Sequence, residues 1–181
     1  MKKSQVTLSI ILLSLVLFFS FAFLNISADS LVLHNFRSYD FRIWQFFTYS
    51  LTHGNLGHLL SNCLFMAFFG SKAEWTLKSK IFLYHMFILS LFSGPAEILF
   101  SGAGSICGMS GLVNFAITIV CLNSKHWIYK IVLPLLILDD LLGIKSQDNI
   151  AHMTHLAGYA YGFYVYHIEK IKNYEKQQNA I

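Results

Sequence analysis

Charged residues are scarce in this sequence. Asp, Glu, Lys and Arg make up 12% of the 181 residues, whereas hydrophobic residues make up 55%. Several apolar stretches reach about 20 residues, which is long enough to cross a bilayer. The composition therefore excludes an ordinary soluble globular protein and predicts an all-α membrane protein. The length allows a single domain.

Cysteine is also rare, and no metal-binding or nucleic-acid-binding motif occurs. Cys63, Cys107 and Cys121 lie in or beside apolar segments, and no C-x-x-C pair is present. Such thiols are more often small buried hydrophobes than ligands. The net charge of +4 comes mainly from basic residues between apolar segments, where they set topology and contact anionic headgroups. We therefore expect no metal, no cofactor and no nucleic-acid partner.

Six apolar segments predict six transmembrane helices. They cover residues 6–26, 49–69, 80–100, 108–122, 128–143 and 150–168. The last three are short for independent spans, so we expect the bundle to shield them. The first segment resembles a signal peptide, but its apolar run of about 20 residues exceeds the usual apolar region of one and favours a retained span.

Residues 28–48, between the first two predicted spans, mix aromatic and charged residues. This mixture predicts an interfacial element that lies partly in the membrane. A simple aromatic belt at the membrane surface is the alternative.

Basic residues predict that both termini are cytoplasmic. If the N-terminus is cytoplasmic, ten lysines lie on the cytoplasmic side and three basic residues lie on the other side. Because both basic ends of the chain then lie on one side, the number of spans is expected to be even. The cytoplasmic set is Lys2, Lys3, Lys72, Lys78, Lys80, Lys125, Lys130, Lys170, Lys172 and Lys176, and the opposite set is Arg37, Arg42 and Lys145. Residues 169–181 then form a short polar cytoplasmic tail.

Polar side chains inside the apolar segments are the candidates for function, because each is costly in a membrane unless it has a partner or a task. His58 and Asn62 are four residues apart and share one helical face. Ser110 follows a glycine-rich turn and begins the fourth segment. His155 precedes two glycines whose spacing lets another helix approach closely.

These groups form a set suited to acyl transfer. An imidazole beside the Ser110 hydroxyl can take its proton and make it a nucleophile. Backbone N–H groups at the glycine-flanked helix start, with His58 and Asn62, can stabilise a developing oxyanion. His152 lies one turn before His155 and competes with it as the base, but glycines three and seven residues later follow only His155.

The chain resembles the rhomboid intramembrane serine proteases in three motifs, which occur in the family's order. The motifs are HLLSN at 58–62, GMSG at 108–111 and HLAGYAYG at 155–162. The resemblance covers roughly residues 40–168. It implies one rhomboid membrane domain over residues 1–181, folded as a six-transmembrane-helix bundle.

The resemblance also implies the roles of the site residues. Ser110 and His155 form a catalytic dyad without a third acid, and the oxyanion site consists of His58, Asn62 and the Ser110 backbone N–H, with Gly108 lining it. Glu74 matches a family glutamate that ties together the loop after the second span.

By this resemblance the protein is an intramembrane serine endopeptidase of a bacterial inner membrane. It hydrolyses peptide bonds in or next to transmembrane helices of membrane protein substrates, which are its partners together with the bilayer. The oligomeric state and the subgroup, including a type that trims C-terminal sorting anchors, stay open.

Two positions depart from the family pattern. The first loop carries Trp44-Gln45 where a Trp-Arg pair is common, so we expect this loop to be pinned differently. Asn114 stands four residues after the nucleophile, where an aromatic residue often stacks on the catalytic histidine. His155 then needs other contacts to orient it.

Two other functions stay open at the level of sequence. A rhomboid-like protein without activity could bind membrane helices, although such relatives usually lack the serine or the histidine. A metal or proton transporter, or a haem protein, could use His58, His152 and His155, although suitably placed carboxylates are few, namely Glu97 and Asp139–Asp140 near helix ends.

Overall fold

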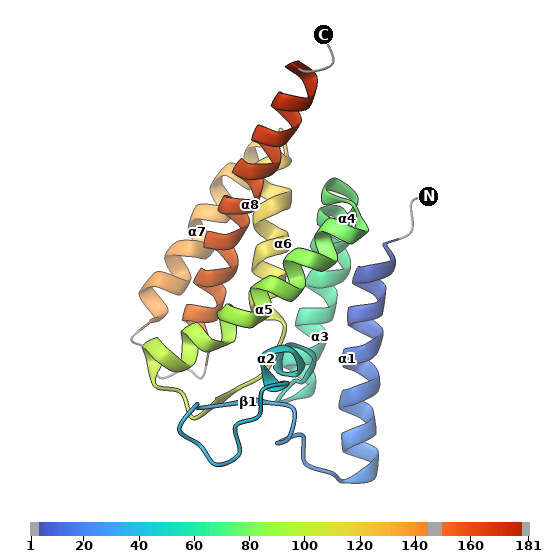
Figure 1. Cartoon of the computed structure of the whole chain (residues 1–181), viewed down its shortest axis with the longest axis vertical. Coiled ribbons are helices and arrows are strands. Elements are labelled where there is room, and N and C mark those ends of the chain that lie inside the picture. Colours follow the sequence, from blue (N-terminus) through green and yellow to red (C-terminus); the bar gives the residue numbers. More distant parts are fainter. Residues whose placement is uncertain (1–3, 145–149, 179–181) are drawn as a thin grey trace.

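The computed structural model describes residues 4–144 and 150–178, and it is mostly helical (Figure 1). Each predicted apolar segment overlaps a helix, which confirms a mostly helical fold. The helices are α1 (Gln5–Leu24), α2 (Gln45–Thr48), α3 (Leu56–Phe65), α4 (Ser71–Leu77), α5 (Ser79–Ser101), α6 (Ser110–Asn123), α7 (Trp127–Gly143) and α8 (His152–Gln178). Among the described residues, α1 and α5 are both long and apolar enough to cross a membrane. The count of six spans therefore stays a prediction.

The second predicted segment begins later than the sequence suggests. Residues 49–51 form a short 3-10 helix, η1 (Tyr49–Leu51), and α3 begins only at Leu56. The reason is local, because the Asn55 side chain accepts a hydrogen bond of 2.8 Å from the His58 backbone N–H and caps the helix there. A π-helical turn, η2 (Met66–Gly70), then joins α3 to α4, so the helical rod covers 56–77 rather than 49–69.

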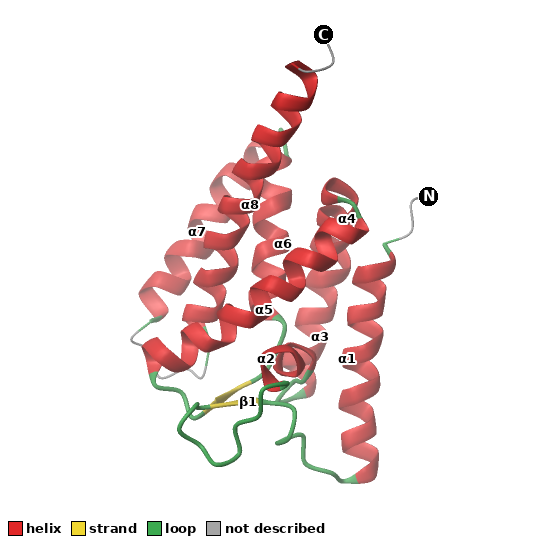
Figure 2. Ribbon diagram, viewed as in Figure 1, coloured by secondary structure: helices red, strands yellow, loops and turns green. Residues whose placement is uncertain are grey.

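A two-stranded antiparallel ribbon links the first loop to the loop after α5. Strands β1 (Leu33–His34) and β2 (Ser105–Ile106) pair with Leu33 opposite Ile106. Both residues are buried with Tyr49 and Ile98 in a small apolar cluster. Figure 2 shows this ribbon and most of the loop residues at one end of the helices. The ribbon therefore fixes the backbone that leads into α6.

Gln45 pins the first loop where the family often has arginine. Its side chain is fully buried. The Oε1 atom accepts hydrogen bonds from the backbone N–H groups of His34 and Arg42, and Nε2 donates to the Asp40 carbonyl at 3.0 Å. The loop is thus held by a neutral amide that satisfies three backbone groups.

Helix α6 forms the centre of the bundle and packs most extensively against α8. Residues 111–121 are all buried. The predicted close approach at the α8 glycines is confirmed, because a Cβ at Gly158 would run into the Gly111 carbonyl and one at Gly162 would lie 2.5 Å from Thr118 Cβ. Small residues at these crossings bring the two backbones together.

The described ends of the chain lie at the end of the bundle opposite the ribbon (Figure 1). The turns between α4 and α5 and between α6 and α7 lie at that end too and hold Lys78 and Lys125, and the helices that these turns join carry Lys72, Lys80 and Lys130. Arg37 and Arg42 belong to the loop at the ribbon end. Lys2, Lys3 and Lys145 lie outside the described residues. The polar tail is predicted over residues 169–181; its part up to Gln178 continues α8, and residues 179–181 lie outside the described residues.

Candidate active site

Ser110 is the first residue of α6 and follows directly from the strand β2 and the turn at Gly108. Gly108 has φ +116°, which an L side chain rarely adopts, and its N–H donates to the Tyr49 carbonyl at 2.9 Å. Met109, next to Ser110, is fully buried and anchors the turn in the core. The sequence GMSG therefore sets the serine at a helix start, where the first backbone N–H groups have no partner within the helix.

His58 lies directly against Gly108. A Cβ at Gly108 would lie 2.5 Å from His58 Cε1 and 2.8 Å from His58 Nε2, so only glycine leaves room for this imidazole. Asn62 is one turn further along α3, as the spacing predicts, and it is 5% exposed. Its Nδ2 atom donates to the His58 carbonyl at 2.9 Å. These contacts hold two candidate oxyanion groups beside the turn that precedes Ser110.

His155 lies in the first turn of α8, beside the helix that begins with Ser110. The neighbours of the two residues are in contact, because a Cβ at Gly111 would lie 2.8 Å from Thr154 Cγ2 and 3.0 Å from the Thr154 carbonyl oxygen. Within the part of the chain that the structure describes, the Ser110 hydroxyl makes no hydrogen bond to a protein group, His155 included.

A buried carboxylate, Asp140 of α7, meets both histidines of α8. Its Oδ1 atom lies 2.7 Å from Nδ1 of His155 and 2.7 Å from Nδ1 of His152. These three residues also form the only group of at least three possible metal ligands found among the described residues. Sequence reasoning missed this contact and set the Asp139–Asp140 pair aside as a helix end. The signal was an acid pair inside an otherwise apolar segment, where an unpaired charge is costly.

Two glutamates hold the helices around the candidate site together. Glu97 of α5 accepts hydrogen bonds from the backbone N–H groups of Met153 and Thr154 at 2.8 and 3.2 Å, which caps the start of α8. Glu74 accepts bonds from the Val6 and Thr7 backbones and from the Ser79 hydroxyl. Glu74 therefore ties the starts of α1 and α5 to α4.

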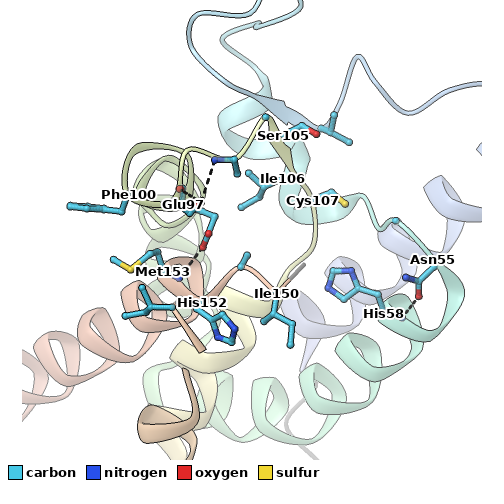
Figure 3. A pocket seen from close by; sticks show the side chains of 17 residues that line it. Asn55, His58, Glu97, Phe100, Ser105, Ile106, Cys107, Ile150, His152 and Met153 are labelled. Carbon is cyan, nitrogen blue, oxygen red and sulfur yellow. Dashed lines mark hydrogen bonds between the residues drawn. The ribbon is translucent and has the colours of Figure 1, made fainter. Parts of the chain in front are cut away.

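A cavity of about 810 Å³ opens beside these groups, at the ribbon end of the molecule. Figure 3 shows His58 and Asn55 on one side of it, Glu97 and Met153 on the other, and β2 with Cys107 between them. His152 belongs to the lining, whereas Ser110 and His155 are not among its lining residues. The cavity thus reaches His58 and the start of α8 from the end opposite the described ends of the chain.

Comparisons with known proteins agree with the motifs. The family model described as the Rhomboid domain matches residues 40–169, which is most of the chain. No curated protein matches the sequence.

Proposed function

The chain belongs to the rhomboid family, and we propose that it is an active intramembrane serine endopeptidase. Ser110 is the nucleophile and His155 the general base. The observation that carries the proposal is the contact of Gly111 with Thr154, which brings the start of α6 against the first turn of α8. Ser110 and His155 are the chain neighbours of these two residues.

The reaction follows from the chemistry of the two groups. The Ser110 Oγ–H bond breaks, its proton passes to Nε2 of His155, and Oγ forms a bond to the substrate carbonyl carbon. The C=O electron pair moves to oxygen, and the oxyanion accepts hydrogen bonds from His58, Asn62 and the Ser110 N–H. His155 then gives the proton to the leaving amine. Water hydrolyses the acyl-enzyme by the same steps.

Gly108 contributes space rather than a donor. Its N–H is already bound to the Tyr49 carbonyl, so it is not available to an oxyanion. Its missing side chain lets the His58 ring lie against the turn. We therefore propose that Gly108 leaves the space for the oxyanion site and that His58 donates a hydrogen bond to the oxyanion.

The substrates are membrane proteins, cleaved in or next to a transmembrane helix. A helix keeps its backbone carbonyls hydrogen-bonded, so a substrate must unwind before Ser110 can attack it. Residues that weaken helices, such as glycine and proline, should therefore favour cleavage near the scissile bond. The cavity at the ribbon end offers the route by which water reaches the site.

We propose a bundle of six spans with both ends of the chain on the cytoplasmic face of a bacterial inner membrane. The short α6 fits this arrangement because its neighbours bury residues 111–121 and it needs little contact with lipid. The lysines in the turns at the end that holds the chain ends agree with the positive-inside rule.

A fluorophosphonate probe, which reacts with activated serines, tests the proposal. We expect the wild-type protein to be labelled and the Ser110→Ala variant not to be labelled. A Ser105→Ala variant is the matched control, because Ser105 lies in β2 close to the same cavity and should not affect labelling. A folded wild-type protein without Ser110-dependent labelling would instead be a rhomboid-like protein that binds membrane helices without cleaving them.

A further inference from the structure

Asp140 is the one acid in contact with the proposed base among the described residues. It is 5% exposed and belongs to the last turn of α7. A buried carboxylate is costly unless hydrogen bonds compensate its charge. Both partners at Oδ1 are imidazole Nδ1 atoms at 2.7 Å, which is the short distance typical of hydrogen bonds to a charged acceptor.

The contact at Nδ1 determines what His155 can do at Nε2. A carboxylate only accepts hydrogen bonds, so the His155 proton must reside on Nδ1. In the neutral ring Nε2 then carries a lone pair and can accept the Ser110 proton. When His155 becomes an imidazolium during attack, the negative charge of Asp140 stabilises it.

The neighbourhood explains why this chain needs such a contact. Asn114 of α6, four residues after Ser110, is buried against α8, where a Cβ at Gly158 would lie 3.2 Å from Asn114 Cβ. No aromatic ring stands at this position to stack on the histidine. The hydrogen bond that His155 Nδ1–H donates to the Asp140 carboxylate of α7 orients the ring instead.

We propose that Asp140 is a positioning residue for His155, which extends the proposed dyad to an Asp140–His155–Ser110 arrangement. This inference rests on the proposed function, because it assigns His155 as the base. Asp140 keeps its charge throughout, and the Ser110 proton stays on His155 until the amine leaves. Asp140 also holds His152, which forms the wall of the cavity next to this pair.

The first test compares Asp140→Asn with Asp139→Asn in cleavage of a reporter transmembrane substrate. The neighbour Asp139 is exposed and provides the same chemical change outside the site. We expect Asp140→Asn to lower kcat by about 10²–10⁴-fold, the range for a misaligned general base, with KM changed less than about threefold. Asp139→Asn should stay within about twofold of wild type. Asp140→Glu, which retains the carboxylate, should recover part of the loss in kcat.

The second test determines which nitrogen of His155 carries the proton in the wild-type protein, so it does not depend on whether an Asp140 variant folds. Nitrogen-15 NMR of labelled histidines distinguishes Nδ1-protonated from Nε2-protonated rings, and His155→Gln and His152→Gln variants assign the signals. We expect neutral His155 to carry its proton on Nδ1. A His155 ring protonated on Nε2 would overturn the inference, and so would a folded Asp140→Asn variant with wild-type kcat.

These outcomes separate the inference from the proposed function. Ser110-dependent labelling in the wild type together with equal labelling rates in Asp140→Asn would overturn only the role of Asp140. An Nδ1-protonated His155 in a protein that never labels at Ser110 would overturn the protease assignment, and with it the catalytic use of the pair, but not the hydrogen bond between His155 and Asp140.

Discussion

A single methyl group at Gly108 tests the geometry of the proposed oxyanion site. In Gly108→Ala the new Cβ would lie 2.5 Å from His58 Cε1 and 2.8 Å from His58 Nε2. Carbon atoms in contact are normally about 3.5–4.0 Å apart, so the imidazole must move by about 1 Å. The φ of +116° adds backbone strain of about 1–3 kcal/mol, because alanine rarely adopts it.

The expected consequence is a loss of catalysis larger than the loss of stability. In the proposed mechanism a displaced His58 no longer donates to the oxyanion, and loss of one such donor typically lowers kcat by about 10²–10³-fold. Cleavage of a transmembrane substrate in proteoliposomes gives kcat, and thermal unfolding of the same samples gives stability. The kcat is calculated per folded molecule.

Gly102→Ala is the matched control for Gly108→Ala. Gly102 also has a positive φ, +73°, but a Cβ there would have no neighbour within 4 Å. This variant should lose about 1–2 kcal/mol of stability from its backbone and keep its kcat. If Gly108→Ala cleaves as fast as wild type, the glycine is only a flexible turn, and the oxyanion site described above is wrong.

Four further substitutions test separate contacts, each by kcat and thermal unfolding in the same assay. His152→Ala should keep substantial activity, and an inactive His152→Ala beside an active His155→Ala would show that the base is the other histidine. Asn62→Ala should lower kcat by about 10²–10³-fold with little change in KM, and an unchanged kcat would remove Asn62 from the site. Gly158→Ala should unfold at lower temperature, because its Cβ runs into the Gly111 carbonyl, and a stability equal to wild type would contradict the close α6–α8 contact. Glu74→Gln should also lower the unfolding temperature, because the buried carboxylate accepts charge-assisted hydrogen bonds. Its kcat should stay unchanged, and a large loss of kcat at full stability would show that Glu74 takes part in the reaction.

Much of the fold could be predicted because its signals are local. Apolar runs locate the helices, and the fourfold spacing of His58 and Asn62 puts them on one face of α3. The glycines after His155 predict the close approach of α8 to another helix, and they meet α6 at Gly111 and Thr118. Each of these features depends on residues within about two helical turns.

The features that were missed depend on side chains that meet across the fold. Asn55 fixes the start of α3 through its own side chain, which the apolar run alone does not reveal. Gln45 holds the first loop through three backbone groups that the turn brings to it. Asp140 reaches His155 only because α7 packs against α8 beside the candidate active site. Composition and spacing carry no information about such contacts.

Cleavage of a purified transmembrane substrate in proteoliposomes tests the central claim most directly. The wild-type protein is compared with Ser110→Ala and His155→Ala, each shown by thermal unfolding to be folded, and the product is mapped by mass spectrometry. The account predicts one or a few cuts in or next to the substrate's transmembrane helix, and a loss of at least about 10³-fold in rate for both variants. Cleavage by folded Ser110→Ala at the wild-type rate would contradict it.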